Sequence, residues 1–192
     1  MMKSLILFFF ISFVTFGQEK TRENTNQHAN SDSTVLLKSN EIAHSKDFEK
    51  LGFELMESET LNKLKLGIQD SDLATILGLP DDTTKNELWG ADGLYHQTYK
   101  YSKLGIKLDL IGETKSDKVI NMITAINPCP FKTSKGISIG SNYQKVEQAY
   151  KDYLNSNFSN AETLVAGSIY GGVIFSFENG EVKSIFIGAS AE

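Results

Sequence analysis

The residue types that most often carry catalysis or metal binding are few in this sequence and widely spaced. Its three histidines are His28, His44 and His96, whereas a zinc site requires three or four converging ligands. Asp81 and Asp82 follow a proline and lack the regular spacing of oxygen ligands in a calcium loop. The sequence contains no phosphate-binding, dinucleotide-binding or serine-hydrolase motif. We therefore predict no catalytic residue, no metal site and no cofactor. On this basis we predict that the protein is not an enzyme.

The one cysteine, Cys129, lies between two prolines in the segment NPCPF. One interpretation is a small apolar residue that fills space in the core. The alternative is a reactive thiol or an intermolecular disulfide. A reactive thiol needs a base or a positive charge beside it, and only Lys132 is close in sequence.

Aromatic side chains are the remaining candidates for a functional surface. Tyr and Trp dominate the energetics of protein interfaces, but they also favour strands and sheet cores, so both interpretations stay open. Tyr99 and Tyr101 lie two residues apart in a predicted strand and should project from the same face. If that face is uncovered, they would form an exposed pair. The candidate partner-binding residues are Trp89, Tyr95, Tyr99, Tyr101 and Tyr170.

The first seventeen residues resemble a cleavable signal peptide. Lys3 precedes an apolar run that is short for a membrane span, and small residues precede a predicted cut before Gln18. We expect an exported protein of the periplasm or the extracellular space, without a stable membrane span after cleavage. An uncleaved anchor is the alternative. The net charge of −5 disfavours nucleic acid as a partner.

A polar stretch follows, over residues 18–47. It is rich in Asn, Ser, Thr and charged residues, and such a composition buries too little apolar surface to offset the entropy lost on ordering. We predict a disordered tether there. Folded structure should begin near Phe48, where the sequence allows either a strand or a short helix.

Two similar phrases, LKLGIQDSDLATILG and KGISIGSNYQKVEQAY, indicate a repeated unit. Gly67 aligns with Gly140, and Leu73 aligns with Val146, an offset of 73 residues. In each copy the apolar spacing is that of one helical face. Gln69 or Asp70 would cap the first helix and Asn142 the second.

Strand patterns follow each predicted helix. The first copy alternates over 95–101, 106–112 and 119–127, and the second over 167–171 and 172–189, where Asn179-Gly180 predicts a tight hairpin turn. We predict an α+β tandem repeat, each unit a helix plus a three-stranded antiparallel sheet, with the helices on one face of a curved sheet. Unit 1, with its N-terminal extension, would span 48–127, and unit 2 would span 128–192.

The phrase LGIQDSDLATILGLPD resembles a motif of the β-lactamase-inhibitor-protein-like fold. That fold is related to the small lipoprotein of the outer-membrane β-barrel assembly machinery. The second copy departs from the motif, because Lys151 stands where the first copy has Gly78. The resemblance implies tandem units on one sheet and a role in protein binding or assembly. The matching positions are Leu64, Gly67, Ile68, Leu73, Gly78 and Pro80.

Two functional hypotheses follow. The first is an exported, non-enzymatic module that binds a protein partner of the cell envelope through the uncovered sheet face. The alternative is a small-molecule binder or hydrolase with a pocket between the two units, since ligand sites favour such junctions.

Overall fold

The structure is a computed structural model that describes residues 47–190, which form one antiparallel sheet of eight strands with three α-helices. The α+β class and the antiparallel sheet are as predicted. The predicted signal peptide (1–17) and nearly all of the predicted tether (18–47) lie outside the described residues. The helices cover residues 47–58, α2 (Asp70–Leu77) and α3 (Tyr143–Tyr150). The strands are β1 (Asp82–Thr83), β2 (Glu87–Leu88), β3 (Tyr95–Tyr101), β4 (Ile106–Thr114), β5 (Asp117–Ile126), β6 (Thr163–Ser168), β7 (Gly171–Glu178) and β8 (Glu181–Gly188).

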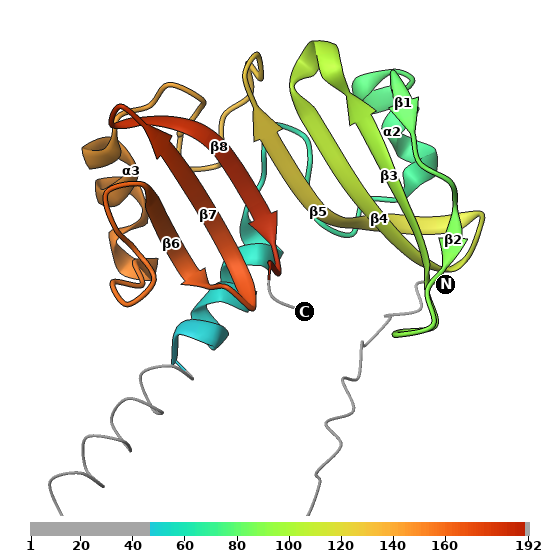
Figure 1. Ribbon diagram of the computed structural model, residues 1–192, viewed down its shortest axis with the longest axis horizontal. Coiled ribbons are helices and arrows are strands. Elements are labelled where there is room, and N and C mark those ends of the chain that lie inside the picture. Colours follow the sequence, from blue (N-terminus) through green and yellow to red (C-terminus); the bar gives the residue numbers. More distant parts are fainter. Residues whose placement is uncertain (1–46, 191–192) are drawn as a thin grey trace, which may run out of the picture.

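The sheet consists of two antiparallel meanders joined at their last strands (Figure 1). The order is β1-β3-β4-β5-β8-β7-β6, and β2 also pairs with β3. We call 61–127 the first half and 128–190 the second half. At the junction Thr124 pairs with Phe186, flanked by the pairs Ile123–Ile187 and Ala125–Ile185. The halves therefore share one continuous sheet.

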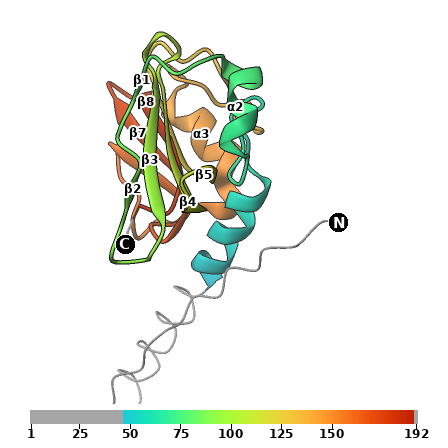
Figure 2. The ribbon, with the colours of Figure 1, turned by 90° about the vertical axis from the view of Figure 1, so that its right-hand side faces the viewer.

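The core lies on one face of this sheet. Along β4, Ile106, Leu108 and Leu110 are buried while Lys107 is exposed, the alternation expected of a sheet with one dry face. Leu73 of α2 and Val146 of α3 are buried in the same apolar cluster as the inward strand residues. Figure 2 shows the helices on one side of the sheet. We call the opposite side the open face.

The two predicted glycines make the same backbone contact in each half. The amide of Gly67 donates to Ile120 of β5 (2.8 Å), and the amide of Gly140 donates to Val182 of β8 (2.9 Å). Their φ angles are +83° and +79°, values that L-residues with a side chain rarely adopt. Each glycine thus lies beside the last strand of its half and turns the chain into the helix that follows it in sequence.

The 47–58 helix lies against the second half. A Cβ atom at Gly52 would overlap the carbonyl oxygen of Gly171 at the start of β7. At the helix end, buried Glu59 accepts hydrogen bonds from the amide of Ser134 (2.7 Å) and from the hydroxyl of Tyr150 in α3 (2.8 Å). The predicted division assigns this segment to unit 1, whereas these contacts lie in residues 128–192.

Several predicted elements occur close to their expected positions. The strand at 95–101 begins and ends as predicted, and Asn179 and Gly180 have the positive φ angles of a tight hairpin turn. Asn142 caps α3 by accepting from the amide of Lys145. Gln69 is the N-cap of α2 but makes no side-chain cap bond.

Other elements differ from prediction. The first strand of the second half covers 163–168, not 167–171, and the Ile169-Tyr170 pair forms the turn that follows it. Short strands β1 and β2 were not predicted, because two-residue strands carry no periodicity.

The two outer edges of the sheet are finished by different segments. Beside β6, the amide of Asn155 donates to Val165 (2.9 Å), and its side chain donates to the carbonyl of Gly167 (3.0 Å). Asn155 is itself buried. Beside β3, the pairing is supplied by β1 and β2. Edges occupied in this way offer few free backbone groups to another strand.

Candidate binding groove and the open face

The open face of the first half carries a groove of about 430 Å³ beside strand β3. Thr98, Asp109 and Met122 lie in register across β3, β4 and β5 and form its floor. The 84–89 segment lines its outer side. The full lining comprises Thr84, Lys85, Glu87, Trp89, His96, Gln97, Thr98, Asp109, Leu110 and Met122.

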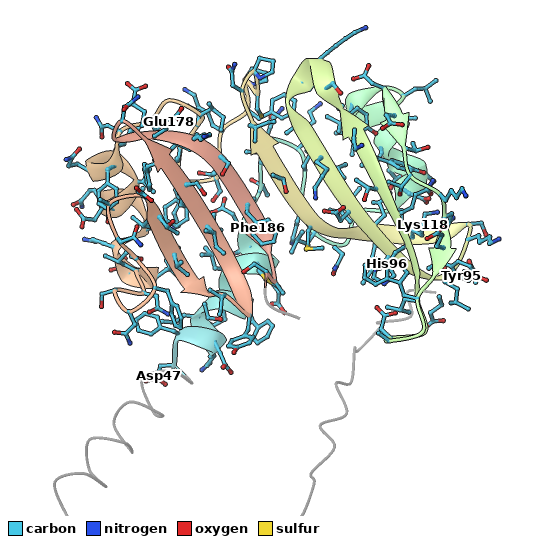
Figure 3. All side chains as sticks on the ribbon, viewed as in Figure 1. Asp47, Tyr95, His96, Lys118, Glu178 and Phe186 are labelled. Carbon is cyan, nitrogen blue, oxygen red and sulfur yellow. The ribbon has the colours of Figure 1, made fainter. Side chains whose placement is uncertain are left out.

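Trp89 and His96 form a flat aromatic stack in this groove. Their ring centroids are 3.8 Å apart and their planes differ by 8°. Trp89 keeps 44% of its surface exposed. Figure 3 shows His96 at the β2 end of the sheet. A large aromatic side chain that is both exposed and packed on one side is a suitable recognition surface.

Asp92 fixes the hairpin that carries Trp89. One carboxylate oxygen accepts from the amide of Leu94 (3.0 Å), and the other lies 2.8 Å from His96 Nε2. The pKa of Asp92 is lowered, first by the Leu94 amide and also by His96. The hairpin is closed as well by backbone hydrogen bonds that join Trp89 to Leu94 and to Gly93. Trp89 is therefore held in place before any ligand binds.

The polar side chains of the groove fall into two groups. On the floor, the hydroxyl of Thr98 donates to Asp109 (2.7 Å), and Lys107 forms an ion pair with the same carboxylate (2.9 Å). On the outer side, Lys85 and Glu87 make no side-chain hydrogen bond or ion pair within residues 47–190. One free ammonium and one free carboxylate thus face the groove.

The open face of the second half is different, because its middle is apolar. Phe186 pairs in register with Ile174 of β7, which pairs with Val165 of β6. Ile126 of β5 pairs with Ser184, two residues from the Thr124–Phe186 pair, and is 51% exposed, whereas Ile174 and Phe186 are partly exposed. Figure 3 shows Phe186 on β8, beside the junction with the first half. Ser176 and Ser184 pair with each other two residues along from Ile174 and Phe186, and Ser184 also pairs with Ile126. We call Ile126, Ile174 and Phe186 the apolar row.

The structure does not bring the five predicted partner-binding residues together. Tyr101 is 2% exposed and lies in the core, and Tyr99 is partly buried against that core. The idea that Tyr99 and Tyr101 form an exposed pair is therefore wrong, because their shared face is the one packed on the helices.

The other three predicted residues are distributed over the sheet. Trp89 lies in the groove beside β3. Tyr95 is partly buried, with the ammonium of Lys115 above its ring at 5.7 Å. Tyr170 is 52% exposed in the β6–β7 turn, at the other edge of the sheet order from Trp89. The five residues cannot form one patch.

Cys129 is buried, and burial raises the pKa of its thiol. A raised pKa reduces the thiolate fraction and with it the reactivity, which favours the space-filling interpretation. His28 and His44 lie outside the described residues. Among residues 47–190, no three His, Cys, Asp or Glu side chains converge on a possible metal position.

Two residues of these surfaces, His96 and Phe186, were not predicted from the sequence as partner-binding residues. His96 lies between Tyr95 and Gln97 in a predicted strand, so its side chain projects from the opposite face. Its polarity could have indicated that this face is the open one. Phe186 lies in the continuous run SIFIGA, where apolar residues occupy both faces and the alternation that would identify the outward position is lost.

No known protein family, curated protein or solved structure matches this chain. Within residues 47–190, no helix has the length and apolar character needed to cross a bilayer. The chemistry of the groove and of the apolar row is therefore the basis on which function can be inferred.

Proposed function

We propose that this chain is an exported, non-enzymatic binding protein of the cell envelope that engages a protein partner through its open face. The observation that carries this proposal is the apolar row of Ile126, Ile174 and Phe186 on a sheet face that faces away from the helices. Protein interfaces commonly combine an apolar centre with a polar surround. Ser176 and Ser184 supply part of that surround.

We further propose that the sheet is a duplicated unit, as the predicted tandem repeat requires. Gly67 and Gly140 make equivalent hydrogen bonds to the last strand of their halves. The acceptors of these bonds, Ile120 and Val182, are 62 positions apart, and so are Thr124 and Phe186, which pair with each other at the junction. An internal twofold axis through the Thr124–Phe186 pair would relate the two glycine contacts in this way.

The resemblance to the β-lactamase-inhibitor-protein-like fold is part of the same proposal. It implies tandem units with helices on one face of a curved sheet, and it implies protein binding. The duplicated Gly67 and Gly140 contacts support it at the positions that the motif occupies.

The alternative, a small-molecule site between the two units, has less support. At the junction Ile123, Ala125, Ile185 and Ile187 are each at most 1% exposed, so the covered side is filled by side chains. The groove that could hold a small molecule lies within the first half.

Site-specific photo-crosslinking tests the protein-binding proposal. A photoreactive phenylalanine analogue at position 186 of the full chain should trap a discrete protein in cells. The same analogue at Gln148, exposed on α3, is the matched control and should trap none. Phe186→Asp should abolish co-purification of that protein. Equal trapping from positions 148 and 186 would contradict the proposal.

Export is tested by mass spectrometry of the chain recovered from the periplasm or medium. The proposal predicts a mature N-terminus at Gln18. A chain that retains residues 1–17 in a membrane fraction would support the anchor instead.

A further inference from the structure

We propose that the Trp89 groove binds a neutral saccharide, and that this site is distinct from the apolar row. The first reason is the shape of the aromatic surface. One face of a pyranose ring presents several C–H groups in a flat array, and these partly positive hydrogens suit the negative face of an indole. Trp89 offers such a surface, since it is 44% exposed while stacked on His96.

The second reason is the charge of the groove lining. Lys85 is positive and Glu87 is negative, and neither has a partner within residues 47–190. Asp109 is already neutralised by Lys107. An anion would meet Glu87, and a cation would meet Lys85. A hydroxyl group can donate to a carboxylate and accept from an ammonium, so a neutral polyol satisfies both side chains without a net charge mismatch.

The third reason is that the groove is organised in advance. The 84–86 segment is fixed to β3 by the hydrogen bond from the amide of Thr98 to the Thr84 hydroxyl (2.8 Å), and the amide of Thr84 donates to the carbonyl of Thr98 (3.0 Å). The Asn86 side chain donates to the carbonyl of Lys115 (2.9 Å). Preorganised groups lose less entropy when a ligand binds. Saccharides gain little from apolar burial, so they need this advantage.

The size of the groove agrees with a small ligand. Its volume of about 430 Å³ lies in the range of known ligand sites, roughly 300–1,000 Å³. One or two sugar rings would fit, with one ring on Trp89 and its hydroxyls toward Lys85 and Glu87.

Intrinsic fluorescence gives a direct assay, because Trp89 is the one tryptophan of the chain. The purified full chain is titrated with neutral mono- and disaccharides of glucose, mannose, galactose and N-acetylglucosamine. The comparison ligands are glucosamine, glucuronate and a lysine-rich peptide. We expect a saturable change in emission with at least one neutral sugar, and none with the charged ligands.

Variants then assign the contacts. Glu87→Gln and Lys85→Gln should each weaken sugar binding about tenfold, the loss expected for one charged hydrogen bond. Trp89→Ala should abolish binding measured by calorimetry, with the melting temperature as a check on folding. Phe186→Ala is the matched control on the same sheet face and should bind the sugar normally.

The outcomes separate this site from the proposed protein interface. The inference is overturned if no neutral sugar changes the emission, if only a charged ligand does, or if Lys85→Gln and Glu87→Gln bind as well as the parent. It is also overturned if a sugar binds only as a glycan on a carrier protein and not when free. None of these results would alter crosslinking from position 186.

Discussion

The two halves of the sheet differ in the segment that connects α2 or α3 to the next long strand. In the first half, residues 79–94 form β1, β2 and a hairpin, and they carry Trp89 and one side of the groove. In the second half, the shorter segment after α3 runs along β6, where Asn155 is buried and occupies the edge. A similar frame therefore presents a polar groove in one half and a closed edge in the other.

The same contrast appears beneath the sheet. In the first half, Asp70 at the start of α2 forms an ion pair with buried Lys118 of β5 (2.9 Å). At the corresponding helix position of the second half, Tyr143 packs on Phe177, with the two ring centroids 4.8 Å apart. Where the first half relies on a charged pair, the second relies on apolar packing. This difference predicts how each half responds to substitution.

The largest effect is expected from Asp70→Asn. This change leaves the Lys118 ammonium buried without a countercharge, and removing one partner of a buried pair costs about 3–5 kcal/mol. Chemical denaturation would measure the free energy of unfolding. Asp72→Asn is the matched control, since Asp72 is exposed in the same helical turn, and should change stability by about 0.5 kcal/mol or less.

The double variant Asp70→Leu with Lys118→Met sharpens the comparison. It replaces the buried ion pair of the first half by apolar side chains, as in the second half. Such replacements are often neutral or stabilising. If the double variant were less stable than Asp70→Asn alone, the ion pair would contribute something that packing cannot replace.

A smaller effect should separate two buried tyrosines. Tyr150 of the second half donates to Glu59, whereas the hydroxyl of Tyr101 in the first half has no partner within residues 47–190. Tyr150→Phe should therefore cost about 1–2 kcal/mol, while Tyr101→Phe should be neutral or stabilising. Thermal unfolding of both variants at neutral pH measures the difference, and equal losses would contradict the assigned hydrogen bonds.

The same pair predicts a dependence on pH. Burial, and next the Glu59 carboxylate, raise the pKa of Tyr150 above its ordinary value of 10.0. The unfolded chain then loses this proton first as the pH rises, so stability should fall above about pH 10. Tyr150→Phe should reduce that slope. Tyr101 and Tyr143, whose pKa values are also raised, should account for part of the remainder.

The smallest expected difference is the one between equivalent glycine variants of the two halves, and it tests whether the halves are duplicates. Gly67→Ala and Gly140→Ala place a side chain at φ values of +83° and +79°, with no atom near either added Cβ. Each should cost about 1–2 kcal/mol through backbone strain alone, and the two losses should agree within about 0.5 kcal/mol. Denaturation midpoints of the two single variants make the comparison. Clearly unequal losses would argue against a duplicated unit.

The sequence predicted strands correctly where apolar and polar residues alternate regularly, and it gave no prediction where they do not. The β3 strand and the Asn179-Gly180 turn follow from local pattern, because backbone geometry determines both. The parity of Tyr99 and Tyr101 was also right, but parity cannot say which face the helices cover. The polar residues His96, Thr98 and Lys100 lie on the opposite face of the same strand, and their polarity indicates that this opposite face is the open one.

Long-range placement could not be predicted in the same way. Gly52 approaches Gly171 and Glu59 approaches Tyr150 across more than ninety residues of chain, and no periodicity encodes such contacts. The groove depends on the Trp89–His96 stack and on the hydrogen bond from Thr98 to Asp109, whose members come together only when the chain folds. Trp89 was a candidate because of its residue type, but the residues that surround it could not be predicted from the sequence.

Hydroxyl-radical footprinting of the full chain, alone and with its captured partner, tests the central claim most directly, because it reports the solvent access of individual side chains. We predict that oxidation of Phe186, Ile126 and Ile174 decreases when the partner is present. Phe53 on the 47–58 helix and Tyr153 beside α3 should be oxidised as before. Protection of Phe53 and Tyr153, with unchanged oxidation of Phe186, would place the partner on the helical side and contradict this account.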